Sequence, residues 1–165
     1  TTLRDRGIAV RARDARPPLD LRAERRVVAG AGNYDAMCAN CHLSPGVPSS
    51  ELSRGLYPRP PALADELAPI DPRTAYWVIK HGIKASGMPA WGASMPDNNV
   101  WDLVAFLGVL PELDPDGYRA LVTASEGHSH ESRHQTDTND DDHKYTEDGD
   151  SHGAAPPHPP ADSLR

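Results

Sequence analysis

Both cysteines of the chain lie in one short motif, Cys38-Ala39-Asn40-Cys41-His42. Three kinds of chemistry use two thiols at this spacing. A structural disulfide would close a loop too small to constrain the unfolded chain much. A thioredoxin-type redox pair should follow a strand in a βαβ pattern, which the sequence does not show. The adjacent histidine favours a haem c attachment site, in which both thiols add to the haem vinyl groups and His42 becomes the proximal iron ligand.

A six-coordinate haem iron needs a second axial ligand from a loop on the other side of the macrocycle, usually methionine or histidine. Met88 stands between glycine and proline, where glycine permits close approach and proline stiffens the loop. We therefore expect Met88 to be this ligand, with Met95 as the second choice. Met37 directly precedes the cysteine motif and is expected to pack within a helix. His81 is expected in solvent at the end of a helix.

The elements that must position these side chains are predicted to be helices, because no stretch shows the alternation of apolar and polar residues typical of a strand. Aspartates that could cap helices stand at Asp71, Asp97 and Asp114, and the first and third are followed by proline. The predicted helices cover about residues 21–42, 73–81, 97–107 and 115–122. The fold class is therefore all-α, with three to five helices and long loops rich in proline and glycine.

Residues 43–70 contain six prolines and are predicted to form one long loop, because proline removes the backbone donors that helices and central strands need. A loop of this length inside a compact domain needs something other than backbone hydrogen bonds to organise it. A cofactor, a metal ion or a partner could do so. A porphyrin would offer such a loop a large apolar packing surface.

Composition divides the 165 residues into three parts. Residues 1–20 are a basic arm or linker, residues 21–123 hold the apolar side chains of one small domain, and residues 124–165 are a tail with six histidines and ten acidic residues. The tail has too little apolar surface to offset its ordering entropy, so we expect it to be disordered when free. The net charge of −7 and the acidic balance of the central part exclude a nucleic-acid-binding protein. No apolar run reaches the roughly 18 residues that span a bilayer.

Five segments resemble the class I bacterial c-type cytochromes, and they occur in the order typical of that family. They are the cysteine motif after a helix containing glycine and tyrosine, Gly55-Leu56-Tyr57-Pro58-Arg59-Pro60-Pro61, Trp77 to Lys84, Gly87 to Gly92, and Trp101 to Leu107. The resemblance covers roughly residues 27–123. It implies a small cytochrome c fold around one covalently bound haem c per chain.

The resemblance also implies contacts around the cofactor. The first and last helices of the family cross near the haem through small and aromatic residues, which match Gly30 or Gly32, Tyr34, Trp101 and Phe106. A loop carbonyl orients the proximal histidine, and Pro45 or Pro48 is expected to provide it. The residues that resemble haem propionate contacts are Tyr57, Arg59 and Trp91.

The function implied is that of an electron carrier, not an enzyme, which passes single electrons between redox protein partners and could be a subunit of an oxidoreductase. With His42 and Met88 both on the iron, which cycles between Fe(II) and Fe(III), no position remains for oxygen or peroxide. Lys80 and Lys84 could steer an acidic partner to the haem edge, or could be ordinary surface lysines.

Haem c is attached after export, so the resemblance implies a periplasmic protein, which we expect to be monomeric. Residues 4–19 are similar to the segment that follows a membrane-spanning helix in anchored members of the family, some of which carry histidine-rich tails. Membrane attachment of the precursor through such a helix is therefore a hypothesis.

Two other functions stay open. Imidazole and carboxylate ligands in the tail suit Cu(II), Zn(II) or Ni(II), which would make the chain a metal-binding or metal-sensing protein. The candidate ligands are His128, His130, His134, His143 and His152. Their irregular spacing indicates weak, multiple sites, and a solubilising acidic tail is the simpler interpretation. An enzyme or sensor in which Met88 leaves the iron is the third possibility, and it predicts rapid carbon monoxide binding.

Overall fold

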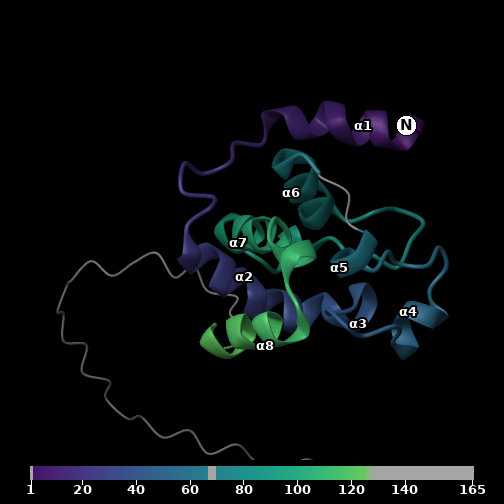
Figure 1. The fold of residues 1–165 in the computed structure, drawn as a ribbon. Helices are drawn as coiled ribbons and strands as arrows, with labels where there is room; N and C mark the ends of the chain where they lie inside the picture. The colour runs from purple at the N-terminus through teal and green to yellow at the C-terminus, as the bar shows by residue number, and fades with distance from the viewer. Residues whose placement is uncertain (1, 67–69, 126, 128–165) are drawn as a thin grey trace, which may run out of the picture. The chain divides into compact units, whose positions relative to one another are not determined.

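The computed structural model describes residues 2–66, 70–125 and 127 (Figure 1). The described residues form helices, turns and loops, with no strand among them, which confirms the all-α fold class. No helix in this described part has the length and apolar character needed to cross a membrane. The candidate metal ligands of the tail lie outside the described residues; they are His128, His130, His134, His143 and His152.

Eight α-helices follow one another in the described residues: α1 (Leu3–Arg11), α2 (Glu24–Met37), α3 (Ala39–His42), α4 (Glu51–Gly55), α5 (Leu63–Glu66), α6 (Pro72–His81), α7 (Asp97–Leu107) and α8 (Pro115–Ala124). They are accompanied by the 3-10 turns η1 (Ala12–Asp14), η2 (Trp91–Ala93) and η3 (Leu110–Glu112). The sequence predicted four helices. It missed α1 within the basic arm of residues 1–20 and α4 and α5 within the long loop of residues 43–70, and it did not separate α3 from α2. Helices α3, α4 and α5 have only four or five residues each. Segments that short show no helical period.

Helices α6 and α8 begin as predicted, with an aspartate cap followed by proline. Asp71 Oδ1 accepts a hydrogen bond from the backbone N–H of Arg73 at 3.0 Å, and Asp114 Oδ1 accepts one from Gly117 at 2.7 Å. Each carboxylate satisfies a backbone donor that the first helical turn leaves unpaired. Gly82 ends α6 at a φ of 65°, a left-handed backbone conformation that favours glycine.

The predicted cap of α7 is wrong. Pro96 occupies the N-cap position, Asp97 is the first helical residue, and no side chain caps this helix. The Asp97 carboxylate instead accepts a hydrogen bond from Nζ of Lys80 at 2.6 Å. The cation on α6 is brought there by tertiary packing, which the local sequence around residue 97 does not reveal.

The core is built where α2 crosses α7. A Cβ at Gly30 would stand only 2.7 Å from both the carbonyl carbon of Asp102 and Cβ of Phe106, so the two backbones are in direct contact. The ring of Tyr34 packs on that of Phe106 with centroids 5.2 Å apart, and Tyr118 of α8 packs edge-on against Tyr34 at 6.3 Å. The expected crossing of small and aromatic residues is therefore present for Gly30, Tyr34 and Phe106.

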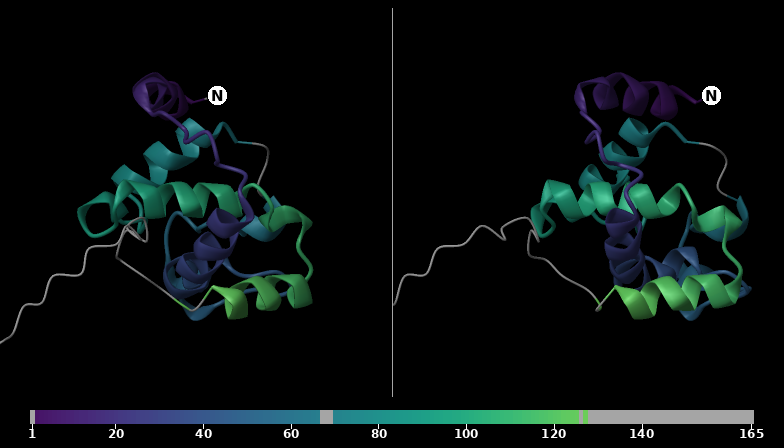
Figure 2. Two further views of the ribbon diagram at one scale, coloured as in Figure 1. Left: turned by 90° about the vertical axis from the view of Figure 1, so that its left-hand side faces the viewer. Right: turned by 60° about the vertical axis from the view of Figure 1, so that its left-hand side comes forward.

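Trp101, and Gly32 as the alternative to Gly30, were also expected at this crossing, and both contact other elements. Trp101 stacks on Tyr76 of α6 with centroids 4.2 Å apart, so it joins α7 to α6. A Cβ at Gly32 would lie 2.6 Å from the carbonyl oxygen of Gly127, so this glycine lets the chain after α8 approach α2. Both views of Figure 2 place α8 alongside α2 and α1 beyond α6.

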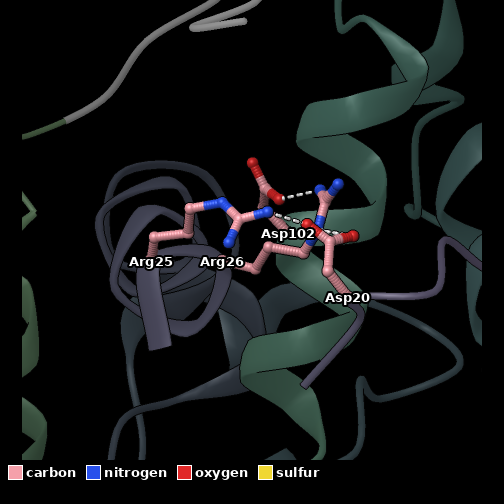
Figure 3. Close-up of polar contacts among 4 residues, drawn as sticks. All are labelled: Asp20, Arg25, Arg26 and Asp102. Carbon is pink, nitrogen blue, oxygen red and sulfur yellow. Dashed lines mark hydrogen bonds and ion pairs between the residues drawn. The ribbon is translucent and has the colours of Figure 1, made fainter. Parts of the chain in front are cut away.

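A buried ion network ties the start of α2 to α7 (Figure 3). Arg26 is 5% exposed, and its Nη1 lies 2.6 Å from Oδ1 of Asp102. Its Nε lies 2.9 Å from Oδ1 of Asp20, in the segment before α2, and Asp20 also pairs with the more exposed Arg25. One guanidinium therefore joins three parts of the chain beside the Gly30 contact.

Replacing Arg26 by glutamine is expected to lower the free energy of unfolding by about 3 to 5 kcal/mol, because it leaves the Asp102 carboxylate buried without its cation. Urea unfolding of the haem-loaded protein measures this. Arg25→Gln is the matched control, since Arg25 shares the partner Asp20 but has a side chain 60% exposed, and it should cost less than about 1 kcal/mol. Equal losses for the two variants would contradict a structural role of the buried network.

Candidate haem site

A cavity of about 620 Å³ opens between α2, α3, the proline-rich loop, α6, the segment before η2, and α7. Its wall is mainly apolar, with side chains such as Leu56, Ile79, Leu103 and Leu107. Cavities that hold cofactors and other small molecules commonly measure 300 to 1,000 Å³. The volume is therefore within the range that a bound cofactor would need.

The cysteine motif lies in the wall of this cavity. Cys38 ends α2 and begins α3, and the backbone N–H of His42 donates to the Cys38 carbonyl at 2.8 Å. This single helical turn brings Cys38, Cys41 and His42 to the same cavity. The two cysteines form no disulfide. Burial, and to a lesser extent the neighbouring Cys41, raises the pKa of the Cys38 thiol to about 12. Burial therefore favours the uncharged form of this side chain in the cavity wall.

The imidazole of His42 is oriented by Pro61. Nδ1 of His42 lies 3.0 Å from the Pro61 carbonyl oxygen, so Nδ1 carries the proton and donates it, which leaves Nε2 as the free ligand atom. Burial lowers the pKa of His42, and this hydrogen bond partly opposes the effect. The ring is thus held neutral, as metal ligation requires.

The expectation that Pro45 or Pro48 provides this carbonyl is wrong. Pro61 lies 19 residues beyond His42, on the far side of α4, whereas the two expected prolines are close to the motif in the sequence. Which of several prolines folds back over the imidazole depends on the path of the whole loop. Neither spacing nor composition determines that path.

Met88 lies in the wall of the same cavity. Its backbone N–H donates to Oγ of Ser86 at 3.2 Å, and its carbonyl accepts from the N–H of Ile83 at 3.3 Å. Gly82 is required beside it, because a Cβ there would stand 2.7 Å from the carbonyl carbon of Pro89. Backbone contacts therefore hold Met88 on a tight loop rather than on a helix.

The other two candidate ligands lie elsewhere. Met95 is 3% exposed and belongs to the apolar core. His81 is exposed at the end of α6, with its ring 4.7 Å from that of Trp77, and it lines a second hollow with Lys80 and Asp97. Among the described methionines and histidines, the cavity wall contains Met37, His42 and Met88.

The expected propionate contacts divide into two groups. Arg59 and Trp91 both line the cavity. Tyr57 is 96% exposed and is not part of the wall. The sequence did not indicate three further wall residues, Arg4, Asp5 and Ile8 of α1. Their proximity to the cavity depends on how α1 folds back on α6, and no local motif signals it.

The two lysines expected to steer a partner differ in their surroundings. Nζ of Lys80 contacts Asp97 at 2.6 Å and the hydroxyl of Tyr76 at 3.0 Å. The Asp97 contact is the main reason that the pKa of Lys80 is raised. Because a carboxylate already pairs with this charge, Lys80 is a poor candidate for long-range steering. Lys84 is exposed, so it is the better candidate.

The all-α fold and the cavity with a Cys-Ala-Asn-Cys-His motif in its wall define a class I c-type cytochrome. Residues 25–107 match the family model described as cytochrome C oxidase, cbb3-type, subunit III, and the chain belongs to this family. No curated protein and no solved structure matches the chain significantly. A cytochrome c domain carries covalently bound haem c and transfers electrons, and such domains are typically extracytoplasmic.

Proposed function

We propose that this chain is a monohaem electron carrier of the periplasm in which Cys38 and Cys41 bind the haem covalently and His42 and Met88 are the axial ligands. The observation that carries the proposal is that all four side chains line one apolar cavity of about 620 Å³. When bound, haem c supplies one-electron Fe(II)/Fe(III) chemistry. The protein's task is then to hold the ligands and exclude water.

Each residue of the site has a distinct task in this proposal. His42 is held by Pro61 in the tautomer that offers Nε2. Met88 is held by Ser86 and Ile83 through backbone hydrogen bonds, so its thioether needs little rearrangement when the oxidation state changes. Arg59 in the cavity wall is a cation for a haem carboxylate. The arrangement suits electron transfer to and from redox proteins, including an oxidase complex.

The proposal is tested by two spectra of the protein purified with its cofactor. The haem should remain attached after denaturation, and its pyridine complex should have the absorbance of a haem with two thioether bonds. The reduced native protein should bind carbon monoxide slowly, because Met88 occupies the sixth position. Immediate binding of carbon monoxide would favour the enzyme or sensor alternative, and haem lost on denaturation would contradict the attachment at Cys38 and Cys41.

A metal-binding tail is the second candidate, favoured by six histidines among ten acidic residues after residue 123. The truncation that tests it should end at Gly127 and not at Thr123, because Ser125 is 2% exposed and Gly127 packs against Gly32. The full chain should then bind Cu(II), and the truncated chain should not. If Cu(II) also shifts the haem midpoint potential in the full chain alone, the tail and the haem are coupled; no binding by either form contradicts this candidate.

A further inference from the structure

Helix α1 lies outside the residues that match the cytochrome family, which begin at residue 25. Its capping box is complete: Thr2 Oγ1 accepts from the N–H of Asp5, and the Asp5 carboxylate accepts from the N–H of Thr2. It lies beside α6 (Figure 1). The residues before the family domain therefore form a defined helix placed against the domain.

One face of α1 forms part of the cavity wall. Arg4, Asp5 and Ile8 line the cavity. Ile8 lies four positions after Arg4 and three after Asp5, and residues at these spacings share a helix face. Two large apolar residues of α1 do not line the cavity, Leu3 and Val10, and they are 87% and 55% exposed. The face toward the cavity is thus the one through which α1 is attached to the rest of the protein.

The protein alone gives α1 little to pack against. None of its nine residues is buried, and the nearest buried anchor is Ala12 of η1, which is 2% exposed. Helices shorter than about 12 residues are marginal in water unless an apolar face is packed. Ile8 is only half-buried, and the space beside it is the cavity. A large apolar group in that cavity would supply the missing contact.

We propose that α1 is a wall of the haem site, with Ile8 packed on the macrocycle and Arg4 at the rim near a haem carboxylate. This inference rests on the proposed function, since it needs a haem in the cavity. Arg4 pairs with Asp5, whose Oδ1 lies 3.4 Å from Nε of Arg4, and the two side chains are 61% and 43% exposed. Such a solvent-exposed pair is weak, so Arg4 is available for a contact with a haem carboxylate. Bound haem then holds α1 in place, and α1 shields one part of the haem from water.

The test compares two substitutions on the same helix in the haem-loaded, full-length protein. Ile8→Ser removes the apolar contact, and Val10→Ser changes a similar side chain that does not line the cavity. Trypsin can cut after Arg6, in the middle of α1, only when the helix opens. Because proteolysis follows the population of the open form, Ile8→Ser should raise the cleavage rate at this bond about five-fold or more, while Val10→Ser should leave it within about two-fold.

The midpoint potential of the haem is the second measurement on these proteins. Ile8→Ser should lower the midpoint potential, because water beside the macrocycle stabilises the more highly charged ferric state. Arg4→Gln should lower it too, because it removes a cation, whereas Arg6→Gln should not, since Arg6 does not line the cavity. The Arg4 variant retains Ile8, so it keeps the inference testable if the Ile8 variant fails to fold.

The outcomes distinguish a failure of the proposed haem-binding function from a failure of the role proposed for α1. If the wild-type protein carries no covalent haem, the proposed function and this inference both fail. If haem is attached but Ile8→Ser and Val10→Ser are cut equally fast, and Arg4→Gln and Arg6→Gln have the same potential, only the role of α1 is overturned. Faster cleavage of Ile8→Ser together with a lower potential in the Ile8 and Arg4 variants supports α1 as a wall of the haem site.

Discussion

The Met88→Leu variant of the haem-loaded protein is expected to lose the absorbance band that reports methionine ligation and to bind carbon monoxide rapidly once reduced. Leucine fills nearly the same volume but offers no lone pair, so in the proposed site it would leave the sixth position of the iron open. Because a methionine thioether favours Fe(II), the midpoint potential should fall by on the order of 0.2 V, within the range that axial ligands set. Spectroelectrochemical titration measures the band and the potential together.

Met95→Leu is the matched control for this substitution. Met95 is 3% exposed and packs within the apolar core, so a volume-conserving change should cost less than about 1.5 kcal/mol of stability. The methionine band, the carbon monoxide kinetics and the potential should remain those of the wild type. The reverse pattern, with the band lost in Met95→Leu and kept in Met88→Leu, would assign the ligand to Met95 and contradict the site described above.

The parts of the candidate site that could be predicted from the sequence depend on residues that lie close together in the chain. The cysteine motif fixes two thiols and an imidazole within five residues, and glycine and proline around Met88 indicate a tight loop. The starts of α6 and α8 were predicted for the same reason, because an aspartate cap and a first-turn proline act within one helical turn. In each case the structure brings together neighbours in the sequence.

The parts that the sequence did not predict depend on contacts between distant segments. Pro61 reaches His42 only because the proline-rich loop folds back. Asp97 is the first residue of α7 and pairs with Lys80 of another helix instead of capping its own. Helix α1 is short and rich in arginine, so its composition indicates an arm, while its inner face is defined by a cavity formed by other elements. Local propensity carries no information on such contacts.

The crossing of α2 and α7 links stability to the site, because both helices also contribute to the cavity. Met37 and Cys38 lie at the end of α2, and Leu103 and Leu107 lie on α7; all four line the cavity. The distance between the two helices is set by the backbone contact at Gly30. A change that separates the helices there should therefore loosen the cofactor site as well as the core.

Gly30→Ala is accordingly expected to lower the free energy of unfolding by about 3 kcal/mol and to reduce the fraction of chains that acquire haem. The added Cβ would stand 2.7 Å from both the carbonyl carbon of Asp102 and Cβ of Phe106, and a helix backbone cannot yield as the end of a flexible side chain can.

Gly55→Ala is the control, because a Cβ there has no atom within 4 Å among the described residues. It should leave haem content unchanged and raise stability by about 0.5 kcal/mol, since alanine has less conformational freedom than glycine in the unfolded chain. Urea unfolding and haem content per chain measure both effects, and a Gly30→Ala protein as stable as Gly55→Ala would show that the α2–α7 contact does not limit the fold.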